Sequence, residues 1–239
     1  MSMFPQSESR RYELEYGTDD RAVFHFFNTV YAWMCAGLAV TATVAWLVSQ
    51  NYALLQVIHT RGVAVAFLLG SLVVVWSIRS AALRVSAGVG LLLFLLYSAL
   101  IGLIVSGIFV IYSLQSIAGV FVVTAGVFGG MSIYGFVTKR DLTKLGSFLI
   151  MTVWGLFLAT LVNIFWANST LYWIITYIGL FAFIALTAYD TQKLKGMSLQ
   201  LQDNPSMAAR VAVVGSLILY LDFINMFLFL LRILGSRRN

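Results

Sequence analysis

The chain has 239 residues, of which 61% are hydrophobic and 10% are charged, and its net charge is +6. Because an ordinary soluble domain carries about 25% charged residues, this composition excludes a water-soluble domain and predicts an all-α membrane protein. The single cysteine excludes an intramolecular disulfide. The basic residues form no stripe with interleaved aromatic residues, so nucleic acid is not an expected partner.

Apolar runs of roughly the length that a bilayer-crossing helix needs, about 20 residues, follow one another along the chain. They cover residues 27–48, 62–78, 86–112, 115–137, 145–166, 171–189 and 211–231. The mixed-charge segment before them lacks the pattern of a cleavable signal peptide. We therefore predict a polar cytoplasmic segment at 1–25, a seven-helix transmembrane domain at 26–235 and a basic tail at 236–239.

Basic residues divide the connections between these runs into two groups. Arginine and lysine precede the first run and follow the second, fourth and sixth, whereas the alternate connections carry only Arg61. Cytoplasmic loops are enriched in such residues, which also meet anionic lipid, so the N-terminus is predicted to be cytoplasmic. The basic tail departs from this pattern. Either the last run is a re-entrant segment, or it crosses the membrane fully. We expect a full crossing, because charges near the end of the chain weigh less once the earlier helices have fixed the topology.

Two aspartates lie where burial is costly. Asp190 ends the sixth run and Asp222 is near the middle of the seventh. A carboxylate inside the bilayer normally faces the interior of a helical bundle and has a polar partner. If the last two helices pack side by side, the carboxylates approach one another, and both cannot comfortably ionise in a low-dielectric site. We therefore predict that Asp190 and Asp222 form a pair that senses pH and gates a pathway.

Arginine residues at the end of the second run are candidates for a latch. A guanidinium can pair with the ionised aspartates and close the path, and protonation then releases it. Arg79 and Arg84 both lie near the right position, and the sequence leaves the two as alternatives.

Further polar residues are candidates for support of the pair. Asn225 lies three residues after Asp222 and shares its helix face. Thr187 and Asn163 are also intramembrane polar residues. Serine and threonine in such helices, including Ser98 and Ser132, are expected to bond to their own backbone.

The sequence lacks the residues that several other classes of membrane protein need for their function. Every lysine lies in a connection, so a retinal Schiff base in the last helix is excluded. His25 and His59 are far apart at the membrane interfaces, which disfavours zinc or haem inside the bundle. Metalloprotease, serine hydrolase and nucleotide-binding motifs are missing. We therefore expect no cofactor.

An intramembrane aspartyl protease is one alternative function. Presenilins use a Tyr-Asp followed by a Gly-x-Gly-Asp, and Tyr189 with Asp190 fits the first half. Asp222, however, follows Tyr220 and Leu221 instead of glycines, and the Pro-Ala-Leu element of presenilins is missing. We therefore expect a protein that is not an enzyme.

Five longer motifs carry a more specific resemblance. They are LYSALIGL at 96–103, TKRDL at 138–142, LVN at 161–163, LTAYDTQKLK at 186–195 and LYLDFIN at 219–225. With these motifs the chain resembles the transmembrane Bax inhibitor motif family over most of residues 26–235, in particular its bacterial inner-membrane members. The resemblance implies a seven-helix bundle with the last helix near its centre and a pH-sensitive calcium leak. It also implies that Asp190 and Asp222 are the proton-sensing pair.

The expected partners are therefore membrane lipid, protons and calcium ions, with calcium as the permeant ion. Some relatives have an acidic residue in the second helix, whereas 62–78 contains none. Calcium takes about six to eight oxygen ligands, and two carboxylates supply about four at most, so binding at Asp190 and Asp222 is expected to be weak and transient, as conduction requires. The alternative is a non-conducting modulator that binds other membrane proteins such as a protease, because the family includes regulatory members.

Overall fold

The computed structural model describes the backbone of residues 6–58, 60–84 and 86–238. It describes their side chains from residue 21 onward, except those of residues 61, 64, 65, 67, 68, 71, 72, 76 and 79. The helices of this part of the chain are α1 (Gln6–Ser49), α2 (Tyr52–Ile58), α3 (Arg61–Arg84), α4 (Ala87–Val105), α5 (Ile108–Ile111), α6 (Leu114–Val137), α7 (Thr143–Trp166), α8 (Ser169–Gln200) and α9 (Pro205–Leu234). Nearly all of the residues that the structure describes are helical, so the predicted all-α class is confirmed.

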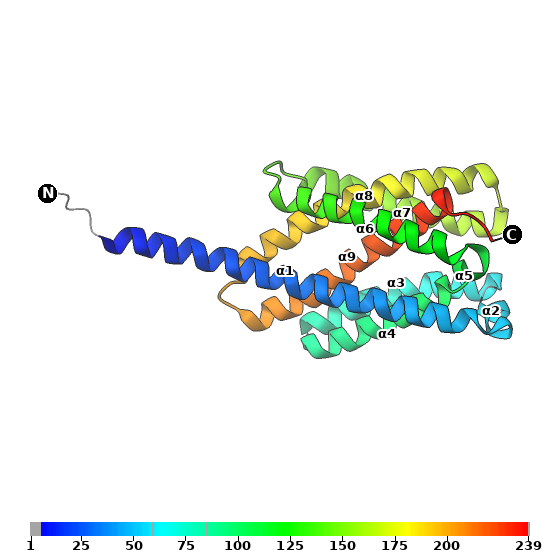
Figure 1. Ribbon diagram of the computed structural model, residues 1–239, viewed down its shortest axis with the longest axis horizontal. Coiled ribbons are helices and arrows are strands. Elements are labelled where there is room, and N and C mark those ends of the chain that lie inside the picture. Colours follow the sequence, from blue (N-terminus) through cyan, green and yellow to red (C-terminus); the bar gives the residue numbers. More distant parts are fainter. Residues whose placement is uncertain (1–5, 59, 85, 239) are drawn as a thin grey trace.

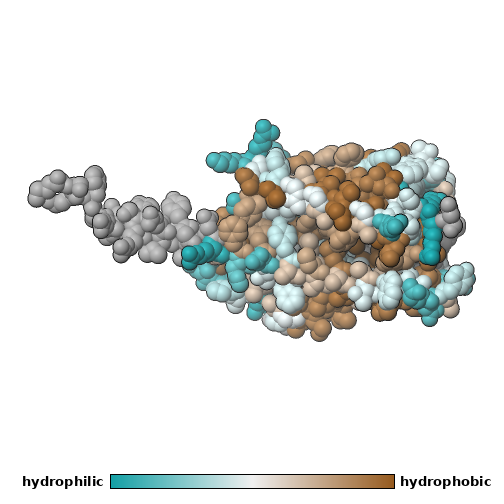
Figure 2. Space-filling model, viewed as in Figure 1, coloured by the Kyte–Doolittle hydropathy of each residue, from teal (hydrophilic) through white to brown (hydrophobic). Residues whose placement is uncertain are grey.

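Six of the helices are long and apolar enough to cross a membrane, judged on the described residues. These spans lie in α1, α4 with α5, α6, α7, α8 and α9. Figure 2 shows hydrophobic residues over the middle of the visible face and hydrophilic residues towards both ends. Large apolar side chains such as Val122, Phe148 and Phe181 are exposed on the surface of the described part, as lipid contact requires. The chain is an integral membrane protein.

The remaining predicted span, the second run at 62–78, corresponds to α3, which runs from Arg61 to Arg84. Several side chains of α3 lie outside the described part, so the count of seven crossings stays a prediction. In the described part, α3 packs against α4 and α9 and ends beside the start of α4. Gly90 of α4 allows this close approach, because a Cβ at that position would meet Ala82 of α3.

α9 lies in the centre of the bundle, where it packs against α1, α3, α4, α6 and α8 (Figure 1). It is the most deeply buried of the six spans, and α7 is the least buried. α7 packs mainly on α8 and forms the outside of the bundle. Any polar side chain in the middle of α9 is therefore held away from both lipid and water.

Both helices of the α8–α9 hairpin extend beyond their apolar runs. α8 continues to Gln200, so the expectation that Asp190 ends the helix is wrong. Hydropathy detects only the apolar part, whereas the extension is held by a buried face that includes Thr191, Leu194 and Ser198. α9 begins at Pro205, where the side chain of the N-cap residue Asn204 accepts a hydrogen bond from the backbone of Met207.

The third predicted span, 86–112, is interrupted. α4 ends at Val105 and α5 begins at Ile108, with Ser106 and Gly107 between them. The Ser106 hydroxyl donates to the Leu103 carbonyl at 2.6 Å, and a serine followed by glycine is a common cause of a kink. The long run is therefore interrupted at Ser106 and Gly107, between α4 and α5.

α9 runs through the bundle from one end towards the other (Figure 1). The beginning of α1 and the connections α3–α4, α6–α7 and α8–α9 lie at one end, and the C-terminus lies at the other (Figure 1). There the tail pairs with the α5–α6 junction, because the Ser113 amide donates to Ser236 and the Arg238 amide donates to Ile111. α9 is one continuous helix of 30 residues, and its full crossing of the membrane stays a prediction.

Candidate functional site

Asp222 lies on the inner part of α9. Its side chain is only 3% exposed. Within the described part of the chain, its Oδ2 atom is buried and accepts no hydrogen bond from an ordinary donor. A buried carboxylate oxygen without a donor costs at least a few kcal/mol, so this position is expensive for the fold.

Asp190 of α8 lies directly against Asp222. The two helices form an antiparallel hairpin, and the two carboxyl groups are within hydrogen-bonding range of one another. Asp190 is partly exposed, and the charge of Lys193, one turn further along α8, acts on it. The structure therefore brings together the two aspartates that the sequence singled out, one fully buried and one closer to water.

This geometry lets the pair hold a proton between its two members. Two carboxylate oxygens can form a hydrogen bond only when one of them carries a proton. With that proton, Asp222 gains the partner that it otherwise lacks; without it, two like charges repel at short range in a low-dielectric interior. Protonation thus changes both the charge and the hydrogen bonding of the α8–α9 contact.

The three candidate supporting residues bond elsewhere. The Asn225 amide donates to the Leu221 carbonyl of its own helix at 2.8 Å. Thr187 likewise donates to the Phe183 carbonyl at 2.8 Å. Asn163 accepts from the Asn168 amide in the α7–α8 connection, away from the aspartates. In the described part of the chain, none of these hydrogen bonds joins the three residues to the aspartates, so their supporting role stays a prediction.

The two candidate latch residues are at the end of α3. The Arg84 side chain is exposed, and that of Arg79 lies outside the described side chains. A neighbouring cation is engaged in a structural contact, because Arg210 of α9 donates to the Leu83 carbonyl at 3.0 Å.

Sequence reasoning missed a chain of hydroxyl groups beside the pair. Tyr31 of α1 bonds to Ser132 of α6 at 2.7 Å, and Ser132 bonds to Thr191 of α8 at 2.9 Å. Ser132 was expected to bond to its own backbone, which is wrong here because three helices meet at this point. Since Thr191 directly follows Asp190, this chain fixes the position of Asp190 relative to α1 and α6.

A second polar contact fixes the opposite face of α9. The Tyr220 hydroxyl bonds to Thr41 of α1 at 2.7 Å, and Thr41 also donates to the Ser98 carbonyl of α4 at 2.8 Å. Residues two apart point to opposite sides of a helix, so Tyr220 points away from Asp222. α9 is therefore anchored on the side that does not carry the carboxylate.

Two of the five motifs, those at 138–142 and 186–195, contact each other near the pair. Gln192 accepts from the Leu142 amide at 2.9 Å and donates to the Arg140 carbonyl at 2.8 Å, so α8 holds the α6–α7 connection. In that connection, hydrogen bonds from Thr143 hold the pKa of the exposed Asp141 below its usual value. These contacts explain the motif at 138–142 as structural support for α8.

Among the residues that the structure describes, the aspartate pair is not part of a larger metal cluster. In the described part of the chain, no group of three or more His, Cys, Asp or Glu residues could hold a metal ion. Two carboxylates alone suit weak contact with a hard cation such as calcium.

Comparison with known proteins defines the class. The family model described as inhibitor of apoptosis-promoting Bax1 matches residues 23–239. The chain therefore belongs to this Bax inhibitor family of membrane proteins, as its motifs indicated.

Its relatives include bacterial proteins of similar length. The inner membrane protein YbhL of Escherichia coli strain K12 is 47% identical over 215 residues, which cover 89% of this chain and 92% of YbhL. An uncharacterized protein of Borreliella burgdorferi is 45% identical over 90% of this chain and 93% of its own length. One of Deinococcus radiodurans is 45% identical over 89% and 90%.

Proposed function

We propose that this protein is a passive, pH-regulated calcium leak pathway, gated by Asp190 and Asp222. It uses no cofactor and carries out no covalent chemistry. The observation that carries the proposal is the contact between the two carboxyl groups in the interior of the bundle. A fold that keeps such a costly pair gains from its change of charge.

The buried oxygen of Asp222 supports a role for protonation. Because this atom has no ordinary donor in the described part of the chain, it gains or loses its hydrogen bond as the pair takes up or releases a proton. The α8–α9 contact is then a two-state element whose equilibrium depends on pH.

Calcium suits the pair as a passing ion. The two carboxylates offer about four oxygens of the roughly six to eight that calcium takes, and water or backbone carbonyls supply the rest. Such a site binds calcium weakly, so an ion that enters can also leave.

The latch and the orientation complete the proposal. An arginine at the end of α3, Arg79 or Arg84, pairs with the ionised aspartates and closes the path, and protonation releases it. The relative YbhL is named as an inner membrane protein, and we propose the same membrane here, with a cytoplasmic N-terminus.

Calcium flux into lipid vesicles tests this function. The purified full-length chain is reconstituted without any partner, calcium is added outside, and an enclosed dye reports its entry between neutral and acidic pH. We expect entry that exceeds the leak of empty vesicles and that rises as the pH falls. Vesicles that remain inert at every pH would overturn the proposal in favour of a modulator of other membrane proteins. Cleavage of a helical peptide substrate without flux would overturn it in favour of a protease.

A further inference from the structure

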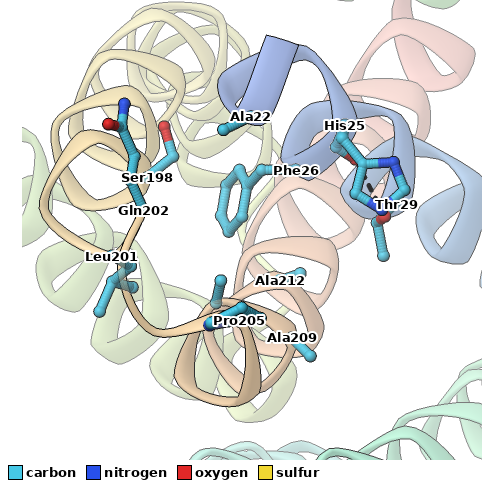
Figure 3. Close-up of a pocket in the computed structure, with 11 residues that line it drawn as sticks. Ala22, His25, Phe26, Thr29, Ser198, Leu201, Gln202, Pro205, Ala209 and Ala212 are labelled. Carbon is cyan, nitrogen blue, oxygen red and sulfur yellow. Dashed lines mark hydrogen bonds between the residues drawn. The ribbon is translucent and has the colours of Figure 1, made fainter. Parts of the chain in front are cut away.

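A hollow of about 380 Å3 opens at the end of the bundle that carries the α8–α9 connection. Figure 3 shows it between the middle of α1, the end of α8 and the start of α9. His25 and Gln202 lie on its two sides, and Ala208 and Ala212 of α9 form part of its wall.

The wall of this hollow continues along α9 towards the aspartate pair. Ala208, Ala212, Gly215, Leu219 and Asp222 follow one another at steps of three or four residues, which places them on one face of the helix. The ten residues from Ala212 to Asp222 correspond to about 15 Å of helix. One helix face therefore leads from the hollow to the carboxylate.

Three apolar residues close this route at the level of Gly215. A Cβ added at Gly215 would lie 2.9 Å from Leu194 Cδ2 and 3.4 Å from Val30 Cγ2. Leu194 is 2% exposed and Val30 is fully buried. The side chains of α8 and α1 thus fill the space that a glycine leaves on α9. None of these side chains offers a polar atom to a hydrated ion.

We infer that the hollow is the vestibule of the pathway and that Val30, Leu194 and Gly215 form its hydrophobic gate. This inference rests on the proposed function, and it adds the position at which the path is closed. A hydrated ion at Ala212 meets only methyl groups ahead of it, and such a constriction excludes water and ions together. Shortening Leu194 leaves room at this level, since the α9 residue that faces it has no side chain.

Reaction of introduced cysteines with a positively charged, water-soluble thiol reagent tests the gate. The full-length protein is held in lipid nanodiscs, which admit reagent from both sides, and the exposed native thiol is first removed by Cys35→Ala. Ala208→Cys marks the vestibule, and Leu219→Cys marks the segment between the gate and Asp222. We expect fast labelling at position 208 and no labelling at position 219.

Adding Leu194→Ala to Leu219→Cys is expected to speed labelling by roughly tenfold, the effect of lowering a barrier by about 1.4 kcal/mol. Leu186→Ala is the matched control, because Leu186 is a buried leucine of the same helix that packs with Leu149 of α7 instead. It is expected to leave position 219 unreactive. If Leu194→Ala does not fold, Leu194→Val replaces it and is expected to give a smaller increase.

Three results would overturn the gate. If Leu219→Cys reacts while Leu194 is intact, the path is not closed at the level of Gly215. No increase with a folded Leu194 variant shows that Leu194 is not the barrier. A position 208 that reacts only with a lipid-soluble thiol reagent shows a lipid-filled hollow. Labelling does not depend on calcium. If Leu194→Ala speeds labelling but the reconstituted protein passes no calcium, the proposed function is refuted and the gate is not.

Discussion

Replacing Asp222 by asparagine is expected to abolish the pH dependence of calcium flux. Asparagine keeps the volume of the side chain, and its amide donates a hydrogen bond to Asp190, so the α8–α9 contact is retained in one state. The charge of the pair can then no longer change at position 222. In native protein, flux controlled by one proton changes by up to about tenfold per pH unit, the equivalent of 1.36 kcal/mol, whereas Asp222→Asn should change by less than about twofold over the same range.

The expected direction follows from the proposed latch. The ionised pair attracts an arginine and the path is closed, so flux through native protein rises as acid protonates the pair. Asp222→Asn removes one of the charges that hold the latch, and its flux should stay near the acidic level of native protein at every pH.

A matched control separates this effect from a general loss of acidic charge. Asp203 is an exposed aspartate in the α8–α9 connection, and Asp203→Asn makes the same chemical change there. It should leave the native pH profile intact. A native profile in Asp222→Asn vesicles would remove Asp222 from the mechanism.

Enlarging Gly135 is expected to have the largest effect on stability. A Cβ at this position of α6 would collide with the carbonyl oxygen of Ala188 in α8. A backbone atom cannot move aside as the end of a side chain can, so α6 and α8 must separate. Overpacking of this kind costs about 1–3 kcal/mol for small additions, and Gly135→Val should cost more than Gly135→Ala.

Gly129 provides the control, because it lies in the same helix with open space around its Cα among the described residues. Gly129→Ala should be neutral or stabilise by up to about 1 kcal/mol, since alanine favours helix. Thermal unfolding in detergent, followed by the fraction of monodisperse protein, ranks the variants. If Gly135→Ala and Gly129→Ala unfold at the same temperature, the close α6–α8 contact does not support the bundle.

Hydropathy predicted those helices whose ends coincide with the ends of their apolar runs. The runs 115–137 and 145–166 differ from α6 and α7 by at most two residues at each end. The extension of α8 beyond Tyr189 could not be found in this way, because it depends on a buried face built from Thr191, Leu194 and Ser198. Hydropathy measures contact with lipid, whereas this extension depends on contact with neighbouring helices.

The aspartate pair could be anticipated because both carboxylates fall in successive apolar runs, where burial is costly, although the short connection that joins the two helices appears only in the structure. Residues 201–204 leave α8 and α9 little choice but to run side by side, which brings Asp190 towards Asp222. Contacts that need a third helix could not be anticipated. Ser132 bonds across α1 and α8, and Val30 meets Leu194 over Gly215, and both depend on where α1 crosses the hairpin.

The most direct test of the account is infrared spectroscopy of the carboxyl groups in reconstituted protein. Asp190 and Asp222 are proposed to hold a proton between them, and this proton is proposed to control the path. We predict a carbonyl stretching band of a protonated carboxylic acid whose intensity follows the same pH curve as calcium flux and which Asp222→Asn alters but Asp203→Asn does not. A spectrum with no carboxyl group titrating over the range in which flux changes would contradict the account.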